Sequence, residues 1–76
     1  MTDTEKLRKA IDKSGLKLSS IMEQMGIKSY TTMRDKIDNR MEFKASEIAK
    51  LCEILHLGTE QMNEIFFAIE AESYSA

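Results

Sequence analysis

Residues 18–38 read LSSIMEQMGIKSYTTMRDKID, two short segments of helical periodicity that meet at Gly26. The second segment begins at Ser29, whose hydroxyl can accept a hydrogen bond from a free amide of the first helical turn, and it runs to about Asp38. A glycine tolerates the left-handed backbone that ends one helix and turns the chain. The spacing therefore predicts two helices joined by a tight turn, with the second projecting from the surface.

The second of these helices has an apolar side and a polar side. At about 100° per residue, Tyr30, Met33 and Ile37 fall within an arc of about 60°, which predicts the side held against the core. The polar side consists of Thr31, Thr32, Arg34, Asp35, Lys36 and Asp38. A polar helix of this size fits a major groove about 12 Å wide, where side chains hydrogen-bond to base edges.

Several side chains of this helix are candidates for contacts with DNA bases. Threonine hydroxyls and methyls suit base edges, and Arg34 can bond to guanine through two nitrogens. Asp35 either accepts from cytosine or orients Arg34 through a charge-assisted hydrogen bond, and the sequence leaves both roles open. The predicted base contacts are Thr31, Thr32, Arg34, Asp35 and Asp38.

Phosphate contacts require only cations or hydrogen-bond donors near the edges of the groove. The predicted phosphate contacts are Lys17, Lys28, Ser29, Tyr30, Lys36, Arg40 and Lys44. For Tyr30 we expect packing against the core first, with its hydroxyl still within reach of a phosphate.

Outside this motif the chain also favours helices, because it contains no proline and only three glycines. We expect helices at about 4–14, 18–25, 29–38, 45–55 and 60–71, with a frayed tail at 72–76. Gly15, Gly26 and Gly58 fall between them, Asn39 takes a turn, His56 caps a helix and Thr59 begins the last helix as its N-cap. The expected core is Leu7, Ala10, Ile11, Leu18, Ile21, Met22, Met25, Met33, Ile37, Met41, Phe43, Ile48, Leu51, Cys52, Leu55, Met62, Ile65, Phe66 and Ile69.

The 76 residues suffice for a single all-α domain, 1–76, with one modest core. The formal net charge is −2, but residues 1–44 hold ten Lys and Arg against seven Asp and Glu, whereas residues 45–76 hold one against six. Such a chain can present a basic face to phosphates and keep an acidic face turned away.

Other classes of function find little support in the composition. Cys52 and His56 are the single cysteine and histidine, so there is no spacing typical of a zinc site and no constellation typical of an enzyme. We therefore expect no enzyme activity, no cofactor, no metal and no small-molecule substrate. No apolar run is long enough to cross a bilayer and the N-terminal residues do not resemble a signal peptide, so we expect a cytoplasmic protein without membrane contact.

The run GLKLSSIMEQMGIKSYTTMRDKIDNRMEFKASEIAKLCEIL, residues 15–55, resembles the lambda-repressor-like family (Cro/CI-type, XRE) of helix-turn-helix proteins. This resemblance implies a compact five-helix domain with the helix-turn-helix in helices 2 and 3. It also implies a transcriptional repressor of phage or mobile-element origin whose partner is double-stranded operator DNA.

The last predicted helix suggests a homodimer. Residues 60–68 resemble the final helix of small phage-derived members of the family, a region that often contributes to dimerisation there. Phe66 and Phe67 are about 100° apart on a helix, so one of them is expected to serve a partner chain. The predicted interface residues are Phe66, Phe67 and Glu70.

The sequence leaves two hypotheses open. The first is a sequence-specific DNA-binding transcriptional regulator. The second is a protein-protein interaction module, such as an antirepressor or adaptor, that keeps the fold without binding DNA. The acidic total and the carboxylates Asp35 and Asp38 favour the second.

Overall fold

The computed structural model describes residues 1–67, and every regular element within them is an α-helix. The helices are α1 (Thr4–Ser14), α2 (Leu18–Met25), α3 (Tyr30–Ile37), α4 (Ala45–Leu55) and α5 (Thr59–Phe66). The all-α prediction is confirmed for these residues, and none of these helices is long and apolar enough to cross a bilayer. The expected continuation of the last helix to residue 71 and the tail at 72–76 lie outside the described residues.

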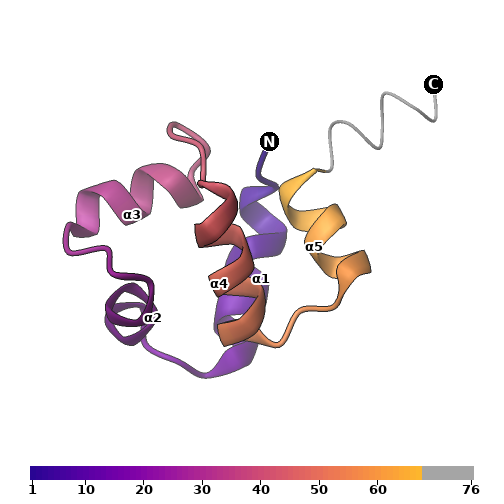
Figure 1. The fold of residues 1–76 in the computed structure, drawn as a ribbon, viewed down its shortest axis with the longest axis horizontal. Coiled ribbons are helices and arrows are strands. Elements are labelled where there is room, and N and C mark those ends of the chain that lie inside the picture. The colour runs from indigo at the N-terminus through magenta and orange to yellow at the C-terminus, as the bar shows by residue number, and fades with distance from the viewer. Residues whose placement is uncertain (68–76) are drawn as a thin grey trace.

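Two central helices separate the last helix from the helix pair that contains Gly26 at its turn. α1 and α4 lie at the centre, α5 packs against both on one side, and α2 and α3 lie on the other side (Figure 1). α2 is seen nearly end-on whereas α3 lies across the view, so these two helices cross instead of running side by side. The first turn of α3 therefore lies at the outer edge of the molecule, far from α5.

The core is built from apolar side chains of all five helices and of the segment between α3 and α4. Its buried members are Leu7, Ile21, Met22, Met33, Ile37, Phe43, Leu51, Ile54, Leu55, Ile65 and Phe66. Most were expected; Ile54 was not, and Met41, which was expected to tuck beneath the helices, is 44% exposed. Ala10, Ile11, Leu18, Met25, Ile48, Cys52 and Met62 are only partly buried at its edge, and Ile69 lies outside the described residues.

Local chemistry explains where most helices end. Gly15 and Gly26 take left-handed backbone angles, with φ of 72° and 75°, directly after α1 and α2. The same role was expected of Gly58 but is wrong there, because His56 (φ 55°) makes the left-handed turn after α4. Gly58 is instead the N-cap of α5, and its N–H donates to Gln61 Oε1 (3.2 Å), so α5 begins at Thr59, one residue earlier than predicted.

The backbone of His56 suggests a stabilising substitution. A side chain in the left-handed region carries a steric cost that glycine avoids, although glycine loses more entropy on folding. We expect His56→Gly to raise the free energy of unfolding by about 0.5–1 kcal/mol in urea denaturation. Glu53→Gly, inside the same helix, should instead lower it by about 1 kcal/mol. Equal losses in the two variants would contradict this.

The C-terminal end of α3 is tied to the N-terminal part of the chain, which sets the position of the helix. Three bonds make this link: Thr4 Oγ1 to the Ile37 carbonyl (2.7 Å), Arg8 Nη2 to Asp38 Oδ1 (2.6 Å) and Thr2 N to Asn39 Oδ1 (3.2 Å). Asn39 takes the left-handed turn predicted for it, with φ of 66°. One end of α3 is thus held, and the other projects.

Candidate nucleic-acid interface

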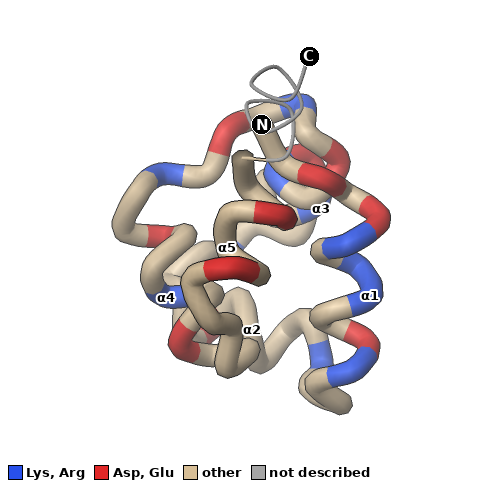
Figure 2. The backbone as a smooth tube through the Cα atoms, turned by 90° about the vertical axis from the view of Figure 1, so that its right-hand side faces the viewer, with Lys and Arg blue, Asp and Glu red and all other residues tan. Residues whose placement is uncertain are grey.

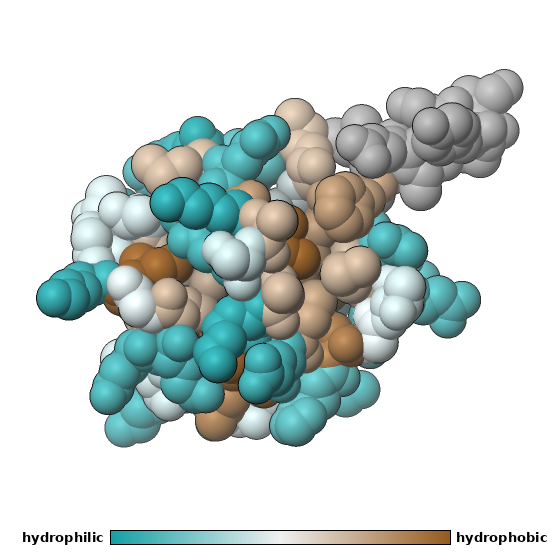
Figure 3. Space-filling view, viewed as in Figure 1, coloured by the Kyte–Doolittle hydropathy of each residue, from teal (hydrophilic) through white to brown (hydrophobic). Residues whose placement is uncertain are grey.

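The exposed side of α3 is polar and begins at a capped N-terminus, and hydrophilic and neutral residues line the left-hand edge of the molecule, where this helix starts (Figure 3). Ser29 is the N-cap, as predicted, and its Oγ accepts a hydrogen bond from Thr32 N (3.3 Å). Tyr30, Thr31 and Arg34 are exposed, whereas Met33 on the opposite side is fully buried. The helix therefore presents an exposed face made mainly from its first turn and a half, which we call the α3 face (Tyr30, Thr31 and Arg34).

The orientation of α3 differs from the prediction at Tyr30. This side chain was expected to pack with Met33 and Ile37, but it is 57% exposed. It is the first residue of α3, and the first turn of this helix lies at the outer edge of the molecule (Figure 1). The Arg34 guanidinium lies 5.9 Å from the centre of that ring, within the range of a cation–π interaction.

The expectation that Lys36 is an exposed phosphate contact is wrong. The residue is 5% exposed and takes the place in the buried arc that was assigned to Tyr30. Its ammonium donates to Glu47 Oε1 on α4 (2.8 Å) and to the Glu42 carbonyl (3.2 Å), and it lies 5.8 Å from the centre of the Phe43 ring. Sequence reasoning missed Glu47, although its position three residues after Lys44, at the start of a predicted helix, is typical of a capping acid.

The two carboxylates predicted to contact bases are already engaged with cations. Asp38 caps the C-terminus of α3 and pairs with Arg8, and its side chain is 27% exposed. Asp35 lies 3.9 Å from Arg40 Nη1, and its side chain is 28% exposed. Asp35, Asp38 and the half-buried Thr32 therefore lie beside the α3 face instead of in its centre, and Arg8 and Arg40 offset the repulsion that free carboxylates would exert on phosphates.

The remaining predicted phosphate contacts are exposed cations. Lys28 and Lys44 line a surface depression together with Ser29 and Thr32, next to the start of α3. Lys17 is the N-cap of α2. Within residues 1–67, no carboxylate lies within 4.0 Å of Lys17, Lys28, Lys44 or Arg34. These four charges are therefore not paired with a carboxylate of the described residues.

The acidic helix α5 lies away from the α3 face. α5 contains Glu60 and Glu64 and no lysine or arginine. Figure 2, viewed from the α5 side, shows these acidic positions in front, and Figure 1 places α3 on the opposite side of the central pair. The separation of charge is partial, because Lys6, Lys9 and Lys13 of α1 line a groove together with Glu64 of α5.

Two of the three predicted dimer contacts, Phe66 and Phe67, lie within the described residues. Phe66 is 2% exposed and packs edge-on against Phe43, with ring centres 5.6 Å apart. Its assignment to a dimer interface is therefore wrong, because its ring fills the core of one chain. Phe67 is partly buried against the same core, and Glu70 lies outside the described residues.

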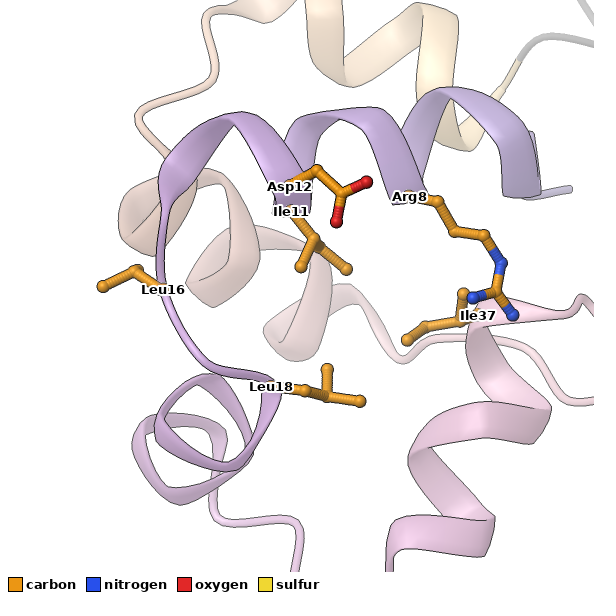
Figure 4. Close-up of a pocket in the computed structure, with 6 residues that line it drawn as sticks. All are labelled: Arg8, Ile11, Asp12, Leu16, Leu18 and Ile37. Carbon is orange, nitrogen blue, oxygen red and sulfur yellow. The ribbon is translucent and has the colours of Figure 1, made fainter.

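Other chemistry finds little support in the described part of the chain. Residues 1–67 contain no group of three or more His, Cys, Asp or Glu side chains placed to hold a metal ion. Burial raises the pKa of the Cys52 thiol, which disfavours the reactive thiolate. A pocket of about 290 Å³ between α1, α2 and α3 is lined by Ile11, Leu18 and Ile37, and the Arg8 side chain extends toward Ile37 at its edge (Figure 4). The Arg8 guanidinium pairs with Asp38 Oδ1 (2.6 Å).

Comparison of the chain with protein-family models, with characterised proteins and with solved structures found no match. No relative therefore transfers a role to any residue. The α3 face and its neighbouring cations have to be interpreted from their own geometry and charge.

Proposed function

We propose that this protein is a sequence-specific DNA-binding transcriptional regulator of the lambda-repressor-like type, which inserts α3 into the major groove of operator DNA. The observation that carries the proposal is the α3 face, exposed at the edge of the domain while Met33 and Ile37 hold the opposite side of the helix in the core. An α-helix is about 10–12 Å across, and the major groove is about 12 Å wide. A helix anchored at one end and free at the other suits this groove.

The roles follow from the chemistry of each side chain. Arg34 reads guanine through its two guanidinium donors, and the Thr31 hydroxyl contacts a neighbouring base edge. Lys17, Lys28, Lys44 and Arg40 contact phosphates and contribute affinity without sequence preference. We further propose that the protein acts in the cytoplasm as a homodimer and a repressor of phage or mobile-element type, with its two α3 helices in successive grooves.

Selection of bound sequences from a random pool of DNA duplexes tests the proposal directly. We expect enrichment of an inverted repeat, because a two-fold symmetric dimer reads two half-sites. Titration of the selected duplex by fluorescence anisotropy should show affinity that falls as the salt concentration rises, because phosphate contacts release counterions. No enrichment, together with no salt-dependent binding, would refute the proposal.

Arg34→Ala measures the contribution of the α3 face. We expect affinity for the selected duplex to fall by about 1–3 kcal/mol, with weaker discrimination at one base pair, because a bidentate base contact is lost. Lys9→Ala is the control: it removes the same charge from α1, at the groove between α1 and α5, and should change affinity much less. Equal losses in the two variants would assign Arg34 a purely electrostatic role.

A second candidate function is protein recognition by the same side of the molecule. It is favoured by two large exposed side chains, Tyr30 at 57% and Met41 at 44%, because tyrosine and methionine are enriched where proteins bind one another. This function predicts no DNA affinity even at low salt. It also predicts that a protein partner binds the wild type and loses affinity for Tyr30→Ala. The selection experiment above separates the two functions.

A further inference from the structure

The buried ammonium of Lys36 joins three parts of the chain. It leaves α3, donates to the Glu42 carbonyl in the loop (3.2 Å) and pairs with Glu47 Oε1 in the first turn of α4 (2.8 Å). The same Oε1 atom accepts the backbone N–H of Lys44 (2.8 Å), the residue that caps α4. One ion pair therefore connects α3 to residues 42–44, the last three residues before α4.

This loop, residues 38–44, carries two of the proposed phosphate contacts. Its first half is fixed by α3 itself, since the Asp35 carbonyl accepts from Arg40 N (2.8 Å) and from Met41 N (3.2 Å). Its second half is fixed by the ion pair. Lys36, Glu47 and Lys44 also line one surface depression with Lys28 and Ser29 at the start of α3, so the pair lies beside the residues that it would align.

We propose that the Lys36–Glu47 pair is a positioning device that holds the Arg40–Lys44 side of the loop in register with the α3 face. The α3 face and the phosphate contacts of the loop can then bind the DNA at the same time. This inference rests on the proposed function. Lys36 and Glu47 are positioning residues here, because neither is exposed enough to be the main contact: their side chains are 6% and 15% exposed.

The choice of a charged pair at this place supports the inference. Burying two charges costs desolvation energy, and apolar residues of similar size often serve stability as well or better. Directed hydrogen bonds, in contrast, specify one geometry: the ammonium needs the Glu42 carbonyl and the Glu47 carboxylate at fixed places, whereas methyl groups would tolerate several loop conformations.

The test replaces both charges at once with apolar side chains of similar size, Lys36→Met with Glu47→Leu. We expect thermal unfolding close to that of the wild type and faster hydrogen exchange at the amides of residues 42–44. Affinity for the selected duplex should fall about ten- to hundredfold, and the slope of affinity against salt should decrease by about one to two counterions, as phosphate contacts are lost. A merely structural pair would lower neither affinity nor slope once the fold is stable.

The matched control is Lys9→Met with Glu5→Leu, which removes an exposed pair of the same charges (3.5 Å) from α1 and should leave affinity unchanged. Unchanged affinity, slope and exchange in the Lys36 and Glu47 double variant would overturn the inference. If that variant does not fold, Glu47→Gln replaces it: an amide oxygen still accepts from Lys36 and Lys44, so a smaller loss in the same direction is expected, and no loss overturns the inference. A wild type that binds no DNA refutes the proposed function itself, and the exchange experiment still decides whether the pair fixes the loop.

Discussion

Phe66→Ala is expected to lower the free energy of unfolding by about 3–5 kcal/mol, the range for removing a buried phenylalanine ring. Phe66 is 2% exposed, and its ring meets Phe43 edge-on at 83°, where the segment before α4 contacts α5. The substitution removes the ring, its aromatic contact and the packing around it. A loss of this size is a large fraction of the stability of a small domain, so partial unfolding at room temperature is expected in urea denaturation or circular dichroism.

Phe67→Ala is the matched comparison. Phe67 is the next residue and only partly buried, so the same change should cost clearly less. A folded Phe66→Ala variant whose only defect is a weaker dimer would contradict the core assignment and restore the interface predicted from the sequence. Sedimentation at several concentrations distinguishes the two outcomes, because a core defect does not depend on concentration.

Glu47→Ala should lower the free energy of unfolding by about 3–5 kcal/mol, the range for breaking a buried ion pair from one side. The substitution leaves the Lys36 ammonium buried without a counter-charge and removes the acceptor for Lys44 N. Glu53→Ala is the control on the same helix: its pair with Lys50 is exposed, at 4.0 Å, and should contribute less than about 1 kcal/mol. Similar losses in both variants would contradict the importance of the buried pair.

The same variant gives a prediction for pH. Burial raises the pKa of Glu47, but the hydrogen bonds from Lys36 and the Lys44 backbone, with the two lysine charges, outweigh it, so the net pKa lies below the ordinary value of 4.5. Stability from Glu47 is therefore fully present above the unfolded-state pKa and lost as the pH falls through the folded-state pKa. The difference in stability between wild type and Glu47→Ala should be largest near neutral pH and narrow below about pH 4.5. A difference that does not change with pH would contradict the ion pair.

Helix boundaries were predictable because the signals that set them act within a few residues. α1, α2 and α4 have the predicted bounds, and α3 differs by one residue at each end, where Ser29 and Asp38 are its caps. Gly26 ends α2 through a left-handed backbone, which glycine adopts without the steric cost of a side chain. The start of α5 differs by one residue from the prediction. The chain makes its left-handed turn at His56, so that Gly58 is free to be the N-cap of α5.

The candidate site was predictable in part. The exposure of Thr31, Arg34 and the cations around the start of α3 follows from their polarity and needs no particular neighbour. The two wrong assignments on the helix, Tyr30 as packed and Lys36 as exposed, have one cause. A helical wheel places residues by polarity, but the direction of the buried side depends on which other elements reach the helix.

The sequence by itself determined where the five helical segments lie, the Ser29 cap of α3 and the exposure of Thr31 and Arg34, because each depends on backbone geometry and periodicity within one or two turns. Only the tertiary structure decided the burial of Lys36, the exposure of Tyr30 and the place of Phe66 in the core. The cost of burying a charge, or of leaving a ring in water, is set by what lies opposite, and the partners Glu47 and Phe43 come from other parts of the chain.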